Sequence, residues 1–201
     1  MPPSFFTAET ETGINSKKVP YMLTKRDEDL LLKRARKSIE TGLDGETMPP
    51  VEKVSEAQEE KMGAFVTLKK HGRLRGCIGF IEGRKALHET VEEMARAAAF
   101  RDPRFRPVTR DELDDLNIEI SVLTPLRRIR NIDEIEAGKH GIYVVKGFHS
   151  GLLLPQVATE YNWDRITFLR ETCGKAGLPG DAWKDKDTAI FIFSARVFGE
   201  E

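Results

Sequence analysis

Leu74-Arg75-Gly76-Cys77-Ile78-Gly79 is the stretch of sequence that decides the fold. It follows a His-Gly turn at residues 71–72 and, before that turn, an alternating segment, Ala-Phe-Val-Thr-Leu-Lys, at residues 64–69. Two such runs joined by a short glycine-containing turn predict a β-hairpin. Successive side chains of a strand point to opposite sides, so Leu74, Ile78 and Phe80 are expected to share the side that packs on the core.

Arg75 and Cys77 share the other side of this predicted strand, about 6–7 Å apart. A thiol reacts as its thiolate, which a neighbouring cation favours, so Cys77 beside Arg75 is a candidate nucleophile. Gly76 and Gly79 leave room for the close approach of a ligand or of another backbone. A free cysteine is also a common small buried hydrophobic residue, and the sequence leaves both interpretations of Cys77 open.

The hexapeptide and several further blocks, in their order and spacing, resemble the AMMECR domain family. These blocks are GAFVTL at 63–68, LRGCIG at 74–79, DPRFRPV at 102–108, IEISVLTP at 118–125, HGI at 140–142 and GLLLPQVA at 151–158. Trp163 and the run CGKAGL at 173–178 also fit, and the blocks cover roughly residues 24–198.

The resemblance implies an antiparallel α+β fold made of two related and intertwined parts. It implies no established activity. Members that resemble this chain form protein A of the AmmeMemoRadiSam grouping, so the resemblance also implies a Memo-like protein and a radical-SAM protein as partners.

The composition is that of a globular protein without a strong charge bias. The chain has 201 residues, of which 32% are charged and 39% hydrophobic, with a net charge of -1. We expect a loosely ordered N-terminal arm at residues 1–20 and one domain with two subdomains at residues 21–201. The balanced charge gives no general attraction to nucleic acid or to anionic membranes.

The cysteines and histidines indicate neither a disulfide framework nor a cofactor. The only two cysteines, Cys77 and Cys173, lie far apart in unrelated contexts, which favours a reducing, cytoplasmic location. Two cysteines are too few to hold an iron–sulfur cluster. The four histidines lack the spacing of a metal site, so we expect no metal and no cofactor.

Helix signals recur along the first half of the chain. Thr24 and Asp27 resemble a capping box that opens a helix to about residue 41, ended by Gly42, and residues 87–100 show helical periodicity. Thr109 and Glu112 form a second capping box for a short helix. Residues 118–123 alternate as a strand, and residues 127–130 are expected to be a basic loop.

The predicted elements of the second half repeat the pattern of the first. We expect a strand at residues 141–145, a second arm at 151–158, a helix at 164–173 and a final strand at 188–197. Both halves then have the order hairpin, helix, strand, which suggests an internal duplication. A cleft between two such halves is the natural place for a ligand.

Six residues are expected to line that cleft: Arg75, Cys77, Asp102, Arg104, Glu119 and His140. In this hypothesis Cys77 is the nucleophile, Glu119 or His140 is the base, and Arg75 and Arg104 hold an anion. Gln156 and Glu160 are the expected counterpart, in the second half, of the Arg75–Cys77 arm.

Each of these assignments has a structural alternative. Glu119 fits better as the ion-pair partner of Arg75 or Arg104 than as a base. His140 fits as an ordinary loop histidine. Asp102 and Arg104 fit as a pair that locks the chain reversal after the helix.

The leading functional hypothesis is a cleft that binds a small polar or anionic ligand, or a modifiable side chain of a partner, with thiol-dependent catalysis left open. The alternative is a non-catalytic adaptor that binds protein or RNA. A basic hairpin tip at residues 69–75 and the arginines of segments 101–106 and 127–130 favour RNA. Sparse aromatic residues and the lack of a known RNA-binding motif speak against it.

Overall fold

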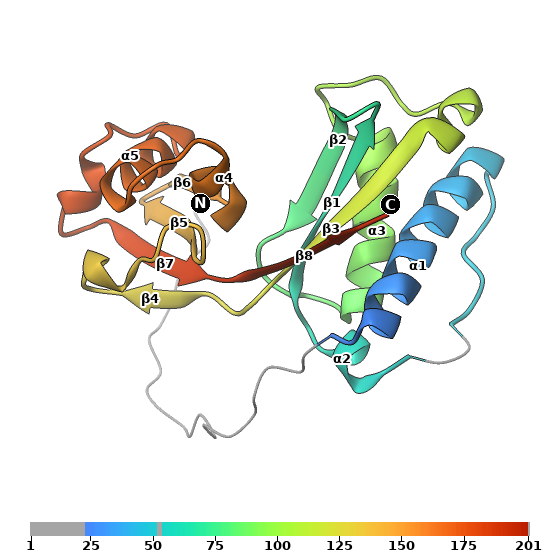
Figure 1. The fold of residues 1–201 in the computed structure, drawn as a ribbon, viewed down its shortest axis with the longest axis horizontal. Helices are drawn as coiled ribbons and strands as arrows, with labels where there is room; N and C mark the ends of the chain where they lie inside the picture. Colours follow the sequence, from blue (N-terminus) through green and yellow to red (C-terminus); the bar gives the residue numbers. More distant parts are fainter. Residues whose placement is uncertain (1–22, 52–53, 201) are drawn as a thin grey trace, which may run out of the picture.

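The computed structural model of the chain describes residues 23–51 and 54–200 and forms two lobes (Figure 1). The predicted N-terminal arm, residues 1–20, lies outside the described residues. The elements are α1 (Lys25–Asp44), α2 (Glu56–Glu59), β1 (Gly63–Lys70), β2 (Arg73–Phe80), α3 (Leu87–Phe100), η1 (Arg110–Asp115), β3 (Leu116–Leu123), β4 (Arg127–Ile129), η2 (Ile132–Glu134), β5 (Gly141–Lys146), β6 (His149–Leu153), α4 (Pro155–Glu160), α5 (Arg165–Lys175), η3 (Ala182–Lys184), β7 (Ala189–Phe193) and β8 (Ala195–Gly199).

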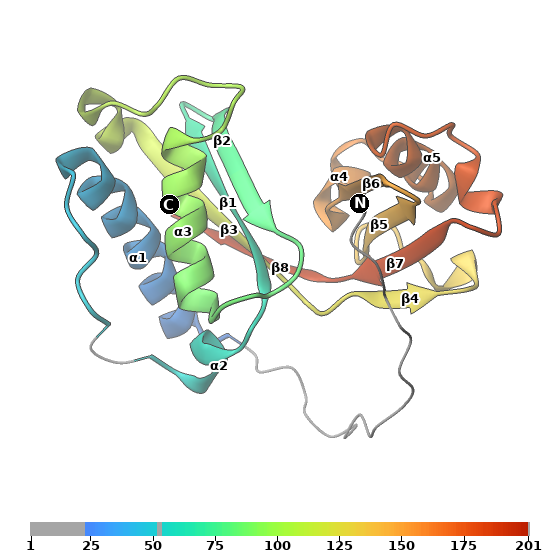
Figure 2. The ribbon, with the colours of Figure 1, turned by 180° about the vertical axis from the view of Figure 1, so that it is seen from behind.

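The first lobe is a four-stranded antiparallel sheet in the order β2-β1-β3-β8, with α1 and α3 on one side (Figures 1 and 2). The hydrophobic alternation of β1 explains this arrangement. Ala64, Val66 and Leu68 are fully buried beneath the helices, whereas the residues between them remain partly exposed. Val91 and Met94 of α3 complete the same core.

Charged side chains fix α1 to the last strand, β8. The Arg36 guanidinium donates to both carboxylate oxygens of Glu200, at 2.7 and 2.5 Å. The Arg196 guanidinium donates to Glu28 at 2.7 Å. The end of the chain is thereby held in the first lobe although it arrives from the second.

The second lobe is another four-stranded antiparallel sheet, in the order β4-β7-β5-β6. Its core lies between this sheet and α5. Ile142 and Val144 of β5 pack with Phe168 and Leu169 of α5, and all four are fully buried. Each lobe therefore has a hydrophobic core of its own.

The two halves are intertwined through their fourth strands. β4 follows β3 along the chain but pairs with β7, and β8 follows β7 but pairs with β3. The two crossing segments are hydrogen-bonded to each other: Thr124 N donates to Ser194 O at 2.9 Å, and Ser194 N donates to Thr124 Oγ1 at 2.9 Å. The predicted α+β fold, with two related and intertwined halves of hairpin, helix and strand, is confirmed.

A glycine in each hairpin marks equivalent positions in the two halves. Gly76 is opposite Leu68 in the first hairpin, and Gly151 is opposite Val144 in the second. A Cβ atom on Gly76 would lie 2.2 Å from a backbone oxygen of α3, and one on Gly151 would lie 2.4 Å from the backbone nitrogen of Ala176, at the end of α5. Both glycines let a helix approach the sheet closely, so Leu152 is the counterpart of Cys77.

That equivalence corrects the predicted counterpart of the Arg75–Cys77 arm. Gln156 and Glu160 lie in α4, not on a strand. The predicted second arm at residues 151–158 was too long, because Pro155 stands at the first position of α4 and cannot continue the strand ladder.

Three further predictions were wrong at element ends. Gly42 does not end α1, which runs to Asp44 and is capped by Gly45 at φ 69°. A Cβ atom on Gly42 would lie 2.5 Å from the Phe100 ring, so this glycine serves the contact with α3. The predicted basic loop contains the short strand β4, and the predicted final strand is divided at Ser194 into β7 and β8, which belong to different sheets.

Candidate functional site

The side of the first sheet that points away from α1 and α3 carries the candidate site. This surface, here called the outer face, comprises the residues that alternate with the buried ones: Phe65, Thr67, Lys69, Cys77, Gly79, Asn117 and Glu119. Cys77 is directly opposite Thr67, and Thr67 is directly opposite Glu119. The three side chains therefore form a row across β2, β1 and β3.

The Cys77 thiol is partly exposed and has a hydroxyl neighbour. Thr67 Oγ1 donates to Cys77 Sγ at 3.3 Å. The other cysteine, Cys173, is buried in the core of the second lobe, and burial raises the pKa of its thiol. Cys77 is thus the more accessible of the two thiols.

Arg75 is turned away from Cys77 by an irregularity in the hairpin. The strand register passes from Leu68 opposite Gly76 to Lys69 opposite Leu74, which leaves Arg75 as an extra residue in β2. Such a bulge re-aims the side chains around it. It also explains why Leu74, predicted to face the core, is 45% exposed.

The redirected Arg75 forms a two-point ion pair with Glu112. Its Nε donates to Glu112 Oε1 at 3.0 Å and its Nη2 to Oε2 at 2.8 Å. The hydrogen bonds from Arg75 lower the pKa of Glu112 to about 2. Arg75 is therefore compensated by a carboxylate, and the expectation that it acts on the Cys77 thiol is not supported by its contacts.

Asp102 and Arg104 close the free edge of β2 beside Cys77. Asp102 Oδ2 accepts from the backbone nitrogen of Cys77 at 2.9 Å, and Arg104 Nη2 donates to the Cys77 carbonyl at 3.3 Å. Together they satisfy the two edge groups that a neighbouring strand would otherwise pair with. Asp102 and Arg104 thus hold the backbone of Cys77 in place, in addition to the chain reversal after the helix for which the pair was predicted.

The Asp102 carboxylate is saturated with donors. Besides Cys77, it accepts from Arg104 Nε at 2.9 Å, Nη2 at 2.6 Å and the Arg104 backbone nitrogen at 3.1 Å. Arg104 holds the pKa of this buried carboxyl far below its usual range. Asp102 is consequently an anion at neutral pH and does not take up a proton.

Glu119 and His140 occupy very different places. Glu119 pairs with Lys69 at 2.9 Å, so the ion-pair interpretation gives the right kind of contact, but the partner is neither Arg75 nor Arg104. His140 belongs to the second lobe, where its Nδ1 accepts from the backbone nitrogen of Glu136 at 3.1 Å. The structure does not bring His140 into the row of Cys77.

A hollow of about 300 Å³ lies between the lobes, beside the outer face. It is lined by Gly79, Phe80, Ile81, Glu82 and Arg84 from the first lobe and by Tyr143 from the second. Of the residues predicted to line an inter-lobe cleft or to give access to it, only Gly79 does so. The others lie along β2 and its edge, on β3 in the case of Glu119, or in the second lobe.

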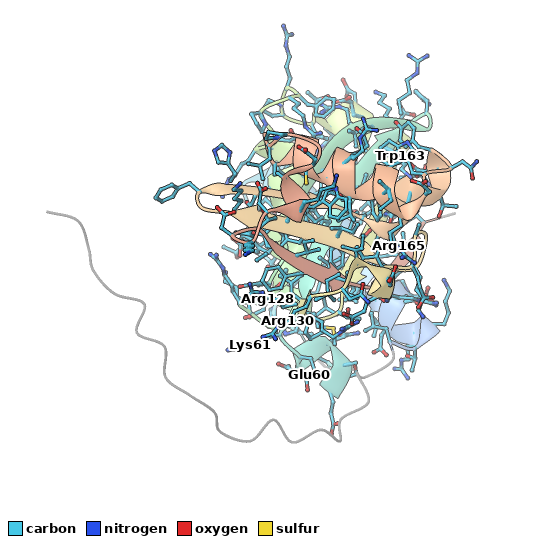
Figure 3. All side chains as sticks on the ribbon, turned by 90° about the vertical axis from the view of Figure 1, so that its left-hand side faces the viewer. Glu60, Lys61, Arg128, Arg130, Trp163 and Arg165 are labelled. Carbon is cyan, nitrogen blue, oxygen red and sulfur yellow. The ribbon has the colours of Figure 1, made fainter. Side chains whose placement is uncertain are left out.

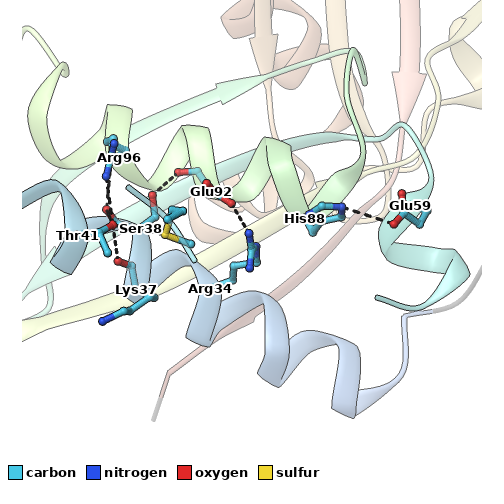
Figure 4. A network of polar contacts seen from close by, with 9 residues as sticks. Arg34, Lys37, Ser38, Thr41, Glu59, His88, Glu92 and Arg96 are labelled. Atoms are coloured by element: carbon cyan, nitrogen blue, oxygen red, sulfur yellow. Dashed lines mark hydrogen bonds and ion pairs between the residues drawn. The ribbon is translucent and has the colours of Figure 1, made fainter. Parts of the chain in front are cut away.

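A larger hollow, of about 610 Å³, lies over α1 and α3 and is lined by charged side chains of the two helices and by the apolar segment 48–51 (Figure 4). Arg34 pairs with Glu92 at 2.7 Å, and Ser38 Oγ donates to the Glu92 carbonyl at 2.8 Å. Arg96 Nη2 donates to Thr41 Oγ1 at 3.1 Å. These contacts join one helix to the other, but they leave two buried atoms of the lining, Arg34 Nε and His88 Nδ1, without a hydrogen-bond partner.

The described residues hold neither a cluster of metal ligands nor a membrane-spanning helix. Residues 23–51 and 54–200 contain no group of three or more histidine, cysteine, aspartate or glutamate side chains placed to hold a metal ion. Within the same residues, no helix combines the length and the hydrophobicity needed to cross a membrane.

Comparison with known proteins decides the family. The family model described as AMMECR1 matches residues 32–198, which include the whole outer face and most of both lobes. The chain belongs to the AMMECR1 family. The resemblance carried by the LRGCIG stretch and its companion blocks is therefore confirmed.

Relatives of this AMMECR1-family chain are found in archaea. A protein of Methanopyrus kandleri is 46% identical over 193 residues, covering 89% of this chain and 91% of that protein. A protein of Thermococcus onnurineus is 46% identical over 184 residues, with 86% and 90% covered. The crystal structure of an uncharacterised protein from Pyrococcus horikoshii is similar with a TM-score of 0.80 at 43% identity, covering 86% of this chain and 90% of that one.

The structure adds residues to the candidate site of this AMMECR1-family chain that the sequence did not single out. Thr67 and Lys69 belong to it because of the register between β1, β2 and β3. Glu112 belongs to it because the bulge directs Arg75 towards the second capping box. The register of the predicted hairpin could have identified Thr67, because it places Thr67 opposite Cys77. No local sequence pattern marks the bulge at Arg75.

Proposed function

We propose that the outer face binds a polar group of a small ligand, or of a partner protein's side chain, at the Cys77 thiol. The observation that carries this proposal is the row of Cys77, Thr67 and Glu119 on an open sheet surface. The thiol and the hydroxyl offer a donor and an acceptor side by side. The exposed ends of Lys69 and Arg104 flank the row and suit a polar or anionic group.

The rigidity of the surroundings favours binding. Asp102 and Arg104 hold the backbone of Cys77 from the edge, and β1 holds it from the other side. A contact group that is already ordered loses little conformational entropy when a ligand arrives. The surrounding ion pairs therefore serve to position the row.

The same geometry makes binding a better-supported proposal than thiol catalysis. β1 separates β2 from β3, so the backbones of Cys77 and Glu119 are about 9–10 Å apart. A base must approach its proton to about 2.6–3.2 Å, or act through one bridging group. If Cys77 were catalytic, Glu119 would take up its proton only through the Thr67 hydroxyl that lies between them.

The proposal leaves room for the partners that the family resemblance suggests. A Memo-like protein or a radical-SAM protein could present the side chain that the outer face receives, with the more demanding chemistry carried by the partner. An adaptor that binds protein or RNA without catalysis is the alternative form of the same binding role.

Protection of Cys77 from alkylation tests the proposed function. The full chain is treated with iodoacetamide in the presence of separate small polar compounds (sugar phosphates, dicarboxylates and amino acids), and modified peptides are quantified by mass spectrometry. A ligand present at ten times its Kd should slow alkylation of Cys77 by about tenfold. The matched control is Glu171→Cys, which places an exposed thiol on α5, on the side of the second sheet away from Tyr143.

The experiment compares the protection of Cys77 with the protection of the control thiol. Protection of Cys77 without protection of the control thiol supports the outer face as a specific site. If no compound protects Cys77, or if every compound protects both thiols equally, the proposed small-ligand function is wrong.

A further inference from the structure

The hollow between the lobes has aromatic walls contributed by both of them. Phe80 lines it from the first lobe and Tyr143 from the second. The Tyr143 ring is itself 6.0 Å from the Phe191 ring, centroid to centroid, at an interplanar angle of 39°. The hollow, at about 300 Å³, is at the small end of the range for ligand pockets, which suits one planar ring system.

One arginine, Arg84, lines the hollow, and two more, Arg128 and Arg130, belong to the second lobe outside its lining. The Arg84 guanidinium lies 5.5 Å from the centroid of the Phe80 ring, and Arg128 is directly opposite Phe191 in the pairing of β4 with β7. Arg84, Arg128 and Arg130 are exposed, and within residues 23–51 and 54–200 none of the three forms an ion pair. Viewed from the end of the second lobe, Arg128 and Arg130 lie on one side of it and Trp163 on another (Figure 3).

We infer that this hollow binds the planar base of a nucleoside phosphate. The base stacks on Tyr143, opposite the wall formed by Phe80 and Arg84, and Arg84 binds its phosphate. Aromatic rings accept any nucleobase because every base has a π-face, and arginine adds a stacking surface and a fork of donors for phosphate oxygens. Glu82, the one acidic residue among the described residues that line the hollow, can accept from an exocyclic amino group of the base.

The inference rests on the proposed function, because the hollow continues the outer face. Gly79 lines the hollow and lies two residues after Cys77 on the same side of β2. A Cβ atom at Gly79 would lie 2.3 Å from the Phe65 ring, so this part of the strand is closely packed and its shape is fixed. A base held in the hollow places the rest of its ligand towards the Cys77 row.

The test compares AMP, ribose 5-phosphate and an eight-residue adenylate RNA, each titrated calorimetrically into the full chain at low salt. AMP should bind more tightly than ribose 5-phosphate by about tenfold or more, because only AMP can stack. Binding of AMP alone identifies a free nucleotide as the source of the base. Binding of the RNA with a salt dependence, where AMP binding is weaker, identifies a single strand.

Four variants locate the binding. Tyr143→Leu and Arg84→Gln should each weaken binding about fivefold or more, through lost stacking and lost charge respectively. Tyr143→Phe keeps the ring and should bind as the parent does. Arg170→Gln, which removes an exposed arginine on α5, should also leave the affinity unchanged. Melting curves of all variants establish that each is folded.

Several results would overturn the inference. These are absence of binding by AMP and RNA at millimolar concentration, equal affinity for AMP and ribose 5-phosphate, or undiminished binding by a folded Tyr143→Leu variant. If these occur while another polar compound protects Cys77 from alkylation, the nucleotide inference fails and the proposed function stands. If AMP binds as described but nothing protects Cys77, the proposed function of the outer face fails separately.

Discussion

The substitution Asp102→Asn tests the closure of the β2 edge most sharply. The amide keeps the shape of the carboxylate but replaces one acceptor oxygen by an NH₂ group. This group is itself a donor and cannot accept the hydrogen bonds that the oxygen received. With Oδ2 replaced, it loses the acceptor for the Cys77 backbone nitrogen at 2.9 Å and for Arg104 Nη2 at 2.6 Å. The remaining oxygen can still accept from Arg104 Nε and from the Arg104 backbone nitrogen.

The expected loss of stability follows from those two bonds. Hydrogen bonds to a charged group are worth about 1.5–3 kcal/mol each. The Asp102 side chain is only 2% exposed, but that of Arg104 is 54% exposed, so water compensates part of the loss. We therefore expect a decrease of about 2–3 kcal/mol in the free energy of unfolding, which lowers the Tm by about 4–12 °C in a chain of this size.

Two assays separate this effect from a general one. Thermal unfolding gives the Tm, and hydrogen exchange gives the protection of the Cys77 amide, which should fall in Asp102→Asn. The matched control is Asp133→Asn, which breaks an exposed ion pair with Arg165, where the aspartate is 74% exposed, and should change stability by less than about 0.5 kcal/mol. A Tm within about 2 °C of the parent, with unchanged exchange of the Cys77 amide, would refute the assignment of Asp102 to the strand edge.

The remaining predictions concern the packing glycines, the acid limb and the outer face. Gly76→Ala should destabilise the chain by about 1–3 kcal/mol, because its Cβ would meet a backbone oxygen of α3 at 2.2 Å. Gly174→Ala in α5 places its Cβ in open space and should stabilise the chain by about 0.5–1 kcal/mol. Denaturant titration of the two variants compares their free energies of unfolding. Because the pKa of Glu112 is lowered to about 2, its ion pair stabilises the fold above the unfolded pKa of about 4.3 and this contribution is lost as the pH falls through about 2. Glu112→Gln should therefore flatten the dependence of the unfolding free energy on pH between about 4.3 and about 2. An unchanged slope would show that the ion pair between Glu112 and Arg75 does not cause this dependence. Thr67→Val should abolish specific protection of Cys77 by any ligand that uses the hydroxyl, and protection equal to the parent's would exclude Thr67 from the site.

The sequence predicted the elements whose signals are local. The hairpin of LRGCIG, the helix at residues 87–100 and the capping box of Thr24 and Asp27 all depend on neighbours within four residues, and all are present. The repeated order of hairpin, helix and strand was also legible, because each half repeats its own periodicity. These features position Cys77 on a strand surface away from the core.

Other features depend on contacts that the sequence pattern does not contain. Gly42 has the residue type of a helix end, but its lack of a side chain serves the Phe100 ring 58 positions further along. The division of the last strand at Ser194 follows from the exchange of β4 and β8 between the sheets. The bulge at Arg75 is set by the register of β1 with β2, which is why the partner of Arg75 was not foreseen.

The candidate site was predicted in part for the same reason. Cys77, Asp102 and Arg104 come together because they are joined by a strand edge and the turn after α3. His140 lies in the other lobe, which residue type alone does not reveal.

The rate of alkylation of the two cysteines in the native chain, measured at pH 8 with and without denaturant, tests the central claim most directly. The account holds that the Cys77 thiol is an accessible contact group on the outer face, whereas Cys173 is buried in a core. It predicts that Cys77 reacts in the folded chain and that Cys173 reacts only after unfolding. If Cys77 is as protected as Cys173 until the chain unfolds, the outer face is closed at its centre and cannot be the binding surface.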